Sequence, residues 1–326
     1  MKHKAVIFSA VLIAAMQTAA VPAFAADSYP TKPVRLIVPY PPGGTTDLIA
    51  RGVAAGLAER YGQQFVTDNR GGASTMIGAE LMASAAPDGY TIGLITQTTM
   101  SINPNVVRKL SYDAARDFSP ITQTVYVPFV ITAHPSVPAN NMKELIALAK
   151  SKPGTVSYGT PGTASTNHLG GALLETLAGI KLLHVPFKGS GPAMNAVLGG
   201  QINFTITGAS TVMPHAKAGR TKIIAFAAEQ RHPNWPDIPS TGEAGLKGYS
   251  SGTWFGIVTR AGTPRTVVTS LNREIIAALN APELKNRLTA IGFDIRTQSP
   301  EEFGKFMNDD RALIAKIIKS AGIKLD

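Results

Sequence analysis

The chain has 326 residues, about twice the usual length of one domain, which favours two domains. Its hydrophobic content of 44% and charged content of 16% exclude a disordered protein, and the absence of cysteine excludes disulfide scaffolds and thiolate metal sites. The net charge of +10 comes from Lys and Arg residues scattered singly or in pairs, so it fits an anionic small ligand better than nucleic acid.

The first 25 residues have the pattern of a secretory signal peptide. Residues 2–4 are basic, residues 5–15 are apolar except for one serine, and Ala-Phe-Ala at 23–25 is a small-x-small cleavage pattern. Gln17, Thr18 and Pro22 shorten the apolar run below the roughly 20 residues that a membrane-spanning helix needs. We therefore expect cleavage after Ala25 and export of the mature protein.

Strand and helix signals alternate along the rest of the chain, which predicts an α/β fold. The run VRLIV at 34–38 predicts a strand, and the loop YPPGGT at 40–45 follows it. A helix is expected from about Thr46, with Asp47 in its first turn, apolar residues at 49, 53 and 57, and Gly62 as its stop. A second helix is expected over 75–85 and a strand over 90–96.

The second half of the chain repeats this order. A strand is expected at 155–158, a loop GTPGTAS at 159–165 and a helix at 166–178, with an apolar stripe of leucines at 169, 173 and 177 and a cap at Gly179. A third unit consists of a strand at 184–187, the loop KGSG at 188–191 and a helix whose first residue is Pro192.

Each unit places a glycine-rich loop with hydroxyl side chains between a strand and the N-terminus of a helix. Free backbone N–H groups and the helix dipole suit such a loop to an anionic group, and glycine lets a ligand approach the backbone closely. Two such loops on facing domains would hold the two ends of a small acid. Ordinary strand-to-helix turns remain the alternative interpretation of each single loop.

Motifs for catalysis and for cofactors are scarce. The chain has no phosphate-binding loop, no G-x-G-x-x-G after its first strand and no H-E-x-x-H, so we expect no cofactor, no metal site and no catalytic residue. Ser165 and His168 leave an exported hydrolase as one alternative, and a structural or chaperone-like envelope protein as another. Tyr40, Phe187 and Trp254 either line a cleft or pack in a core.

Eight segments, taken in order, resemble one protein family. They are RLIVPYPPGGTTDLIAR at 35–51, DNRGGA at 68–73, PDGYT at 87–91, YGTPGTAS at 158–165, VPFKG at 185–189, GEAG at 242–245, WFG at 254–256 and AGTP at 261–264. Over essentially the whole mature chain, they resemble the substrate-binding proteins of tripartite tricarboxylate transporters, the Bug-type periplasmic proteins.

The resemblance implies an α/β periplasmic-binding-protein fold of the type II-like, flytrap form, with two domains joined by two interdomain crossovers. It places domain 1 at 27–124 and 251–326, and domain 2 at 125–250. The implied function is capture in the periplasm of a small organic carboxylate: a di- or tricarboxylate, an aromatic acid or a hydroxy acid. The implied partners are that ligand and the inner-membrane permease subunits of a transporter, with the binding protein a monomer. A periplasmic ligand sensor without a dedicated permease is the alternative.

The resemblance also nominates ligand-binding residues on three loops. The first loop contributes Pro42, Gly43, Gly44, Thr45 and Asp47, the second Thr160, Gly162, Thr163 and Ser165, and the third Lys188 and Gly189. Three residues are added because they lie at a strand end: Thr96, Gln97 and Thr98.

Two further candidate residues depart from the family pattern. Phe187 and Thr207 stand where the family usually has Tyr and Asp. Because Thr207 offers no negative partner to an ammonium group, we predict a ligand that lacks an amino group.

Overall fold

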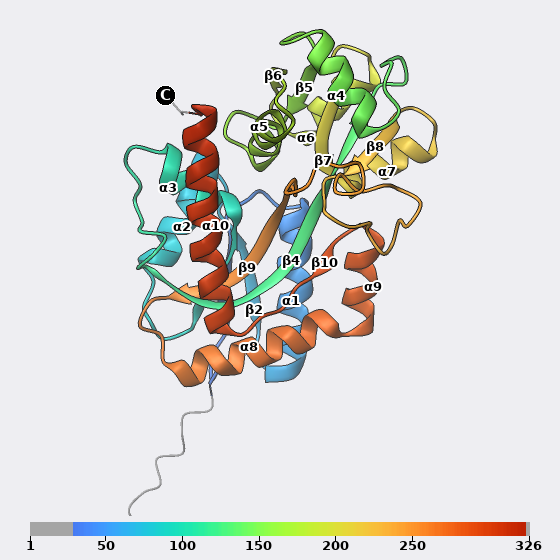
Figure 1. The fold of residues 1–326 in the computed structure, drawn as a ribbon. Helices are drawn as coiled ribbons and strands as arrows, with labels where there is room; N and C mark the ends of the chain where they lie inside the picture. Colours follow the sequence, from blue (N-terminus) through green and yellow to red (C-terminus); the bar gives the residue numbers. More distant parts are fainter. Residues whose placement is uncertain (1–28, 324–326) are drawn as a thin grey trace, which may run out of the picture.

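A computed structural model describes residues 29–323 and shows two α/β lobes, one above the other in Figure 1. The predicted signal peptide at 1–25 lies outside the described residues. In chain order, the first lobe contains β1 (Val34–Val38), α1 (Thr45–Tyr61), β2 (Phe65–Asn69), the 3-10 turn η1 (Ala73–Thr75), α2 (Met76–Ala83), β3 (Thr91–Thr96), the π-helical turn η2 (Thr98–Ile102), α3 (Asn103–Val106) and the start of β4 (Phe118–Ala133).

The second lobe contains the end of β4, α4 (Met142–Ser151), β5 (Ser157–Thr160), α5 (Thr166–Ala178), β6 (Leu183–Pro186), α6 (Ser190–Leu198), β7 (Phe204–Gly208), α7 (Ala209–Lys217) and β8 (Lys222–Phe226). The chain then returns to the first lobe through β9 (Gly252–Arg260), α8 (Arg265–Asn280), α9 (Pro282–Ala290), β10 (Asp294–Ile295) and α10 (Pro300–Ala321).

The strands follow the order β2-β1-β3-β9-β4-β7-β5-β6, and β8 and β10 also pair with β4. Strand β1 is parallel to β2 and β3, and β5 is parallel to β6 and β7. Strands β1 and β3 are almost entirely apolar, as expected for parallel strands covered on both faces. In such sheets ligands lie beyond the carboxyl ends of the strands, so the loops after β1, β3 and β5 are the places to look for a site.

Strand β4 is long enough to belong to both lobes (Figure 1). Its residues from Phe118 to Pro128 pair with β9, and those from Phe129 to Ala133 pair with β7 and β8. The hydrophobic cores divide at the same place, because Val127 packs in the core of the first lobe and Phe129 in that of the second. The returning chain passes from Tyr249, in the second core, to Phe255, in the first. Two crossovers therefore connect the lobes.

Helix α1 matches its prediction closely. The apolar residues at 49, 53 and 57 are fully buried, and Gly62 adopts the left-handed conformation (φ 66°) that ends the helix. Gly56 lets α8 come close, since a Cβ there would lie 2.6 Å from the Cβ of Ala278. The amphipathic pattern thus identified the core face of α1 correctly.

Helix α5 has the predicted span, with Ser165 as its N-cap and Gly179 (φ 60°) at its end, and the predicted leucine stripe is right only in part. Leu169 is buried, whereas Leu177 is 42% exposed. Small residues complete the buried face, and Gly170 and Gly171 approach Ser251 and Tyr158. A pattern of large apolar residues cannot indicate a helix face made of glycines.

Several element boundaries differ from the predictions by one or two residues. Strand β5 begins two residues later, at Ser157, and α2 begins at Met76 because η1 precedes it. Helix α6 begins at Ser190 rather than Pro192, since Gly189 (φ 121°) turns the chain two residues earlier than expected.

Helix α10 is the last element and starts with a capping box between Ser299 and Glu302. In Figure 1 it stands beside the first lobe and rises to the level of α5 in the second.

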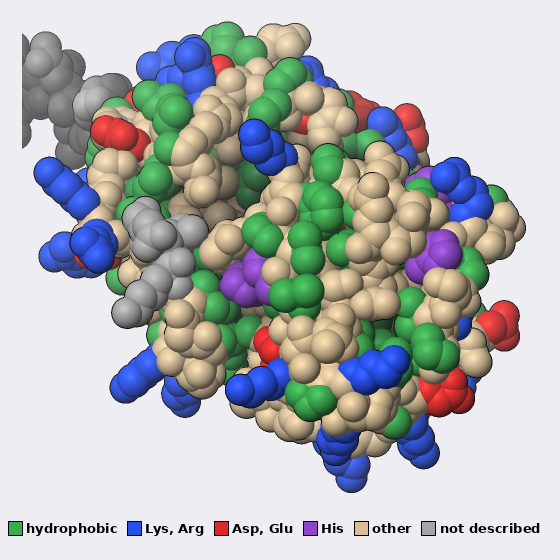
Figure 2. Space-filling view, turned by 90° about the horizontal axis from the view of Figure 1, so that it is seen from above, with side chains coloured by type: hydrophobic (Ala, Val, Ile, Leu, Met, Phe, Trp, Pro, Cys, Tyr) green, Lys and Arg blue, Asp and Glu red, His purple; other side chains and the backbone are tan. Residues whose placement is uncertain are grey.

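Within residues 29–323, no helix combines the length and apolar character needed to cross a bilayer. On the face seen in Figure 2, Lys and Arg side chains are scattered over the surface and around its outline.

Candidate functional site: a cavity between the lobes

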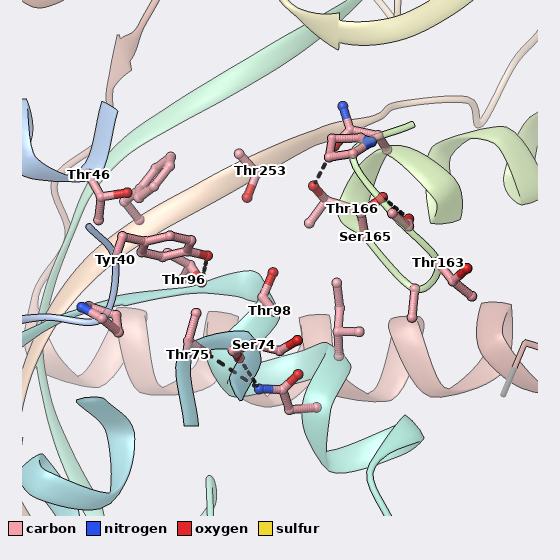
Figure 3. A pocket seen from close by; sticks show the side chains of 18 of the residues that line it. Tyr40, Thr46, Ser74, Thr75, Thr96, Thr98, Thr163, Ser165, Thr166 and Thr253 are labelled. Carbon is pink, nitrogen blue, oxygen red and sulfur yellow. Dashed lines mark hydrogen bonds between the residues drawn. The ribbon is translucent and has the colours of Figure 1, made fainter. Parts of the chain in front are cut away.

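A cavity of about 520 Å³ lies between the two lobes. The first lobe contributes the loop after β1, the starts of α1 and α3, the segment after β2, the end of β3 and the turn that follows it (Figure 3). The second lobe contributes the loop after β5 and the start of α5, and β9 adds two residues. The lining residues are Pro39, Tyr40, Pro41, Thr46, Gly72, Ser74, Thr75, Thr96, Thr98, Ile102, Asn103, Pro161, Gly162, Thr163, Ala164, Ser165, Thr166, Asn167, Thr253 and Phe255.

Hydroxyl groups dominate this lining, with nine Ser and Thr residues, one Tyr and two Asn amides. None of the lining residues, all within the described part of the chain, carries a charge. Ile102, Phe255 and the prolines supply apolar surface. Neutral hydroxyls donate to carboxylates and also accept from hydroxyls, so the cavity suits a small, oxygen-rich molecule with an apolar middle.

The first-lobe wall is cross-linked by side-chain hydrogen bonds, and Figure 3 shows the one between Tyr40 and Thr96. The Tyr40 hydroxyl lies 3.3 Å from Thr96 Oγ1, which lies 3.3 Å from Thr99 Oγ1. Thr99 in turn donates to Thr75 Oγ1 at 2.9 Å. Burial raises the pKa of Tyr40, so its phenol stays protonated at neutral pH and can donate. The segments that follow β1, β2 and β3 are therefore tied into one surface.

The turn η1 has an unusual backbone. Ala73, Ser74 and Thr75 all have positive φ (46°, 49° and 77°), a conformation that costs a non-glycine residue of order 1–3 kcal/mol. Asn103, 1% exposed, holds this turn by donating from Nδ2 to Ser74 O at 2.7 Å and to Thr75 Oγ1 at 3.4 Å. The cavity wall at Ser74 and Thr75 thus depends on a residue 28 positions away along the chain.

The second-lobe wall is built by local hydrogen bonds. Ser165 Oγ donates to Gly162 O at 2.7 Å and accepts from the backbone N–H of His168 at 3.2 Å, which caps α5. The backbone N–H of Ala164, a residue with φ 57°, donates to His168 Nδ1 at 3.1 Å. These bonds span three or four residues, so the loop 161–165 sets its own shape.

Two stacked imidazoles support this loop from behind. The rings of His168 and His184 lie 3.8 Å apart and nearly parallel, at 7°. His184 Nε2 lies 2.6 Å from Thr160 Oγ1, whose hydroxyl donates to Gly162 O at 3.1 Å. Burial lowers the pKa of His168, and burial together with the neighbouring His168 lowers the pKa of His184 to about 4. Both rings are therefore neutral at physiological pH.

The geometry gives the hydrolase alternative no support. The Ser165 hydroxyl and the His168 ring each bond to the loop, and within residues 29–323 no hydrogen bond joins one to the other. The spacing G-x-S-x-G occurs at 248–252, but Ser250 leads into strand β9, whereas a nucleophile elbow turns from a strand into a helix. The described residues also hold no group of three His, Asp or Glu side chains suited to a metal ion.

The first loop lines the cavity through Tyr40 and Pro41 rather than through its glycines. Pro42, Gly43 and Gly44 are exposed and lie outside the cavity lining. The Asp47 carboxylate is occupied within the protein rather than turned to a ligand. It accepts hydrogen bonds from Arg51 Nε (2.8 Å), Gly43 N (3.0 Å) and Asn69 Nδ2 (3.0 Å). The bond from Arg51 holds the pKa of Asp47 below its usual range. Thr45 is the first residue of α1, and its side chain is not among those described.

The other nominated residues divide into two groups. Those in the cavity wall are Thr96, Thr98, Gly162, Thr163 and Ser165. The remainder do not line it. Gln97 donates to Asp310, Thr160 supports the loop, and Phe187 packs beside Ala196 and Ile202. Lys188 is exposed, Gly189 is the N-cap of α6, and Thr207 is buried in β7. Tyr40 lines the cavity, whereas Trp254 is core, at 1% exposure.

Several lining residues were not nominated from the sequence: Thr46, Ser74, Thr75, Asn103, Thr166, Asn167 and Thr253. The segment GGAST at 71–75 carries the same signal as the other loops, since a glycine pair follows a strand and precedes a helix. Asn103 and Thr253 carry no such local signal.

A second cavity, of about 830 Å³, also lies between the lobes and shares no lining residue with the first. It is lined by residues of β4, of the segment 228–234 and of 280–297, including Arg231, His232, Lys285, Asp294 and Arg296. His232 Nε2 lies 2.9 Å from Asp294 Oδ1. Asp294 also lies 3.7 Å from Arg296, and Arg231 pairs with Glu243, so this cavity is lined by charged side chains, unlike the neutral hydroxyls of the first cavity.

Comparison with known proteins identifies the family. The model of the tripartite tricarboxylate transporter family receptor matches residues 49–323. Protein BugT of Bordetella pertussis is 31% identical over 301 residues, covering 92% of this chain and 92% of BugT. Among solved structures, an R. palustris protein with adipate is 35% identical, with a TM-score of 0.81, over 91% of this chain and 99% of that one. MatC from Rhodopseudomonas palustris with bound malate is 28% identical, with a TM-score of 0.76, over 89% of this chain and 100% of MatC.

These matches confirm the predicted resemblance and the predicted two-domain α/β periplasmic-binding-protein fold. The relatives are solute-binding proteins rather than enzymes, in agreement with a cavity that lacks a catalytic arrangement within the described residues. The chain belongs to the family of tripartite tricarboxylate transporter receptors, the periplasmic solute-binding proteins.

Proposed function

We propose that this protein captures a small organic carboxylate without an amino group in the cavity between its lobes and presents it to the permease subunits of a tripartite transporter. The observation that carries this proposal is a lining that is rich in hydroxyls, drawn from both lobes and free of charge among the described residues. The signal peptide expected at 1–25 would deliver the chain to the periplasm.

No Asp or Glu is among the lining residues, and this disfavours a ligand that carries an amino group. An ammonium group taken out of water needs a negative partner, and here it would meet only neutral oxygens. A carboxylate is better served, because Ser, Thr and Tyr hydroxyls donate charge-assisted hydrogen bonds to it. Thr207, the residue behind the sequence-based prediction, is buried in β7 and does not line the cavity, so the neutral lining is the stronger argument.

The relatives agree with this choice of ligand. The R. palustris protein was solved with adipate and MatC with malate, two dicarboxylates without an amino group. A cavity of about 520 Å³ is within the ordinary size range of small-molecule sites, roughly 300–1,000 Å³. We therefore extend the dicarboxylates, together with aromatic and hydroxy acids, to this chain as candidates.

Binding would couple to the relative position of the lobes. We place domain 1 at 27–124 and 251–326 and domain 2 at 125–250, which is supported by the division of the cores near Val127 and Phe129. An acid that bonds to hydroxyls of both domains favours the closed arrangement, because only that arrangement provides all its partners.

A thermal-shift screen tests the proposal with matched pairs of acids: succinate against aspartate, glutarate against glutamate, and adipate against 2-aminoadipate. We expect only the acids without an amino group to raise the melting temperature. At one hundred times its dissociation constant, a ligand stabilises the fold by about 2.7 kcal/mol, a shift that is readily measured. Stabilisation by the amino acids alone, or by none of a broad acid library, would refute the proposal.

A substitution in the cavity wall tests whether the acid binds in this cavity. Thr98→Val removes one hydroxyl from the wall, and we expect a loss of affinity of about tenfold to a hundredfold, since a hydrogen bond to a charged group contributes about 1.5–3 kcal/mol. Thr269→Val, on the exposed side of α8, is the matched control and should leave affinity unchanged. Equal affinities for both variants would place the ligand elsewhere.

A further inference from the structure

Helix α10 is fixed firmly to the first lobe at its middle. Asp310 accepts from Gln97 Nε2 at 2.8 Å and from Trp254 Nε1 at 3.0 Å. The next residue, Arg311, donates from Nε to Met100 O and from a terminal nitrogen to Ala114 O, both at 3.0 Å. The half-helix beyond Arg311 therefore projects as a rigid arm of the first lobe.

That arm reaches the second lobe. Ile314 and Ile318 of α10, with Ile323, form one buried apolar cluster with Leu169 and Ala172 of α5. The cluster also contains Ala164 from the second lobe and Ile102 and Val106 from the first, and every member is 8% exposed or less. Figure 1 shows the upper end of α10 beside α5. The lobes thus touch through packed side chains as well as through β4 and β9.

The cluster borders the ligand cavity directly. Ile102 and Ala164 belong both to the cluster and to the cavity lining. Leu169 lies in the first turn and a half of α5, whose N-terminal residues Ser165 to Asn167 form the second-lobe wall. A movement that separates α5 from α10 would therefore open the cavity at the same time.

We propose that the C-terminal half of α10 is a hydrophobic latch: its isoleucines hold α5 and thereby keep the lobes together in the ligand-free protein. Separation of the lobes exposes the apolar side chains of the cluster to water, so the contact favours the closed arrangement. The latch determines how close the lobes lie before a ligand binds. Its effect on the ligand-free protein therefore does not depend on which ligand the cavity takes.

The test measures the distance between the lobes directly. The chain has no cysteine, so Val66→Cys on β2 and Leu183→Cys on β6, both exposed, accept one spin label each in an otherwise unlabelled protein. Double electron–electron resonance on the ligand-free, labelled protein then measures the distribution of distances between the two labels in Ile318→Asp and in Leu313→Asp. Ile318 is 6% exposed and lies in the cluster, whereas Leu313, on the same helix, is 54% exposed.

We expect Ile318→Asp to shift the inter-label distance to longer values and broaden it, and Leu313→Asp to reproduce the parent distribution. Circular dichroism and a cooperative melting transition establish that each variant is folded. Should Ile318→Asp not fold, Ile314→Ala combined with Ile318→Ala gives the same comparison with a milder change. An unchanged distance in a folded cluster variant overturns the latch. A failure of the acid screen with a clear distance shift would instead refute the proposed function and leave the latch standing.

Discussion

The two walls of the cavity are held in place by different means. The wall from the first lobe rests on contacts between distant segments, in which Asn103 holds Ser74 and Thr75, and Tyr40 meets Thr96. In the wall from the second lobe, the loop 161–165 closes on itself through Ser165, His168 and Gly162, and longer-range contacts lie behind it. The comparison teaches that the lining of one half of the site is set by tertiary structure, whereas the loop that lines the other half is shaped mainly by local sequence.

The largest expected effect comes from the long-range wall. Asn103→Ala removes the donor to Ser74 O and Thr75 Oγ1 and leaves a strained turn, in which only Thr75 is buried, without this support. We expect the free energy of unfolding to fall by about 2–3 kcal/mol, together with loss of acid binding. Urea denaturation measures the first quantity and calorimetry the second. A change in stability below about 0.5 kcal/mol, the size of an ordinary surface effect, would contradict the role given to Asn103.

The stacked histidines predict a pH dependence that belongs to the second wall. Because the pKa of His184 is lowered from 6.5 to about 4 in the folded protein, the unfolded chain takes up the proton first as the pH falls. The stability due to the neutral ring is complete above pH 6.5 and is lost as the pH falls towards 4. We expect a loss on the order of 1–2 kcal/mol, allowing for the partial exposure of the ring.

Melting temperatures across that pH range check this expectation. His184→Gln cannot titrate and should flatten the curve between pH 6.5 and 4. His215→Gln, in the last turn of α7, serves as the control that keeps the slope. If the melting temperature falls equally steeply with pH in the His184 variant and in the parent protein, the stacked histidines do not cause the loss of stability between pH 6.5 and 4.

The N-cap of α5 gives a smaller, purely local effect. Ser165→Ala removes the acceptor for the backbone N–H of His168 and the donor to Gly162 O. We expect a loss of stability of about 1 kcal/mol, the usual cost of an N-cap serine, and a weaker response to acids. Thermal unfolding of Ser165→Ala and Ser165→Asp provides the check, because aspartate also caps a helix and should restore most of the stability. No recovery in Ser165→Asp would mean that capping is not the role of this hydroxyl.

The same contrast explains what could be read from the sequence. Strand β1, helix α1 and helix α5 follow local patterns, and so does the loop whose Gly162, Thr163 and Ser165 line the cavity. Asn103 and Thr253 reach the cavity only because the chain folds back, and no spacing in the sequence indicates this. Asp47 shows the opposite error: an acidic residue beside a glycine loop suggests a ligand contact, yet its carboxylate is occupied by Arg51, Gly43 and Asn69.

The most direct test of the central claim is a crystal structure of the protein with a non-amino dicarboxylate such as adipate. The account predicts carboxylate oxygens within hydrogen-bond distance of uncharged hydroxyl groups from both lobes, including Thr98 from one and the 163–166 segment from the other. An acid bound in the second cavity beside Arg296, or held by a charged side chain elsewhere, would contradict it.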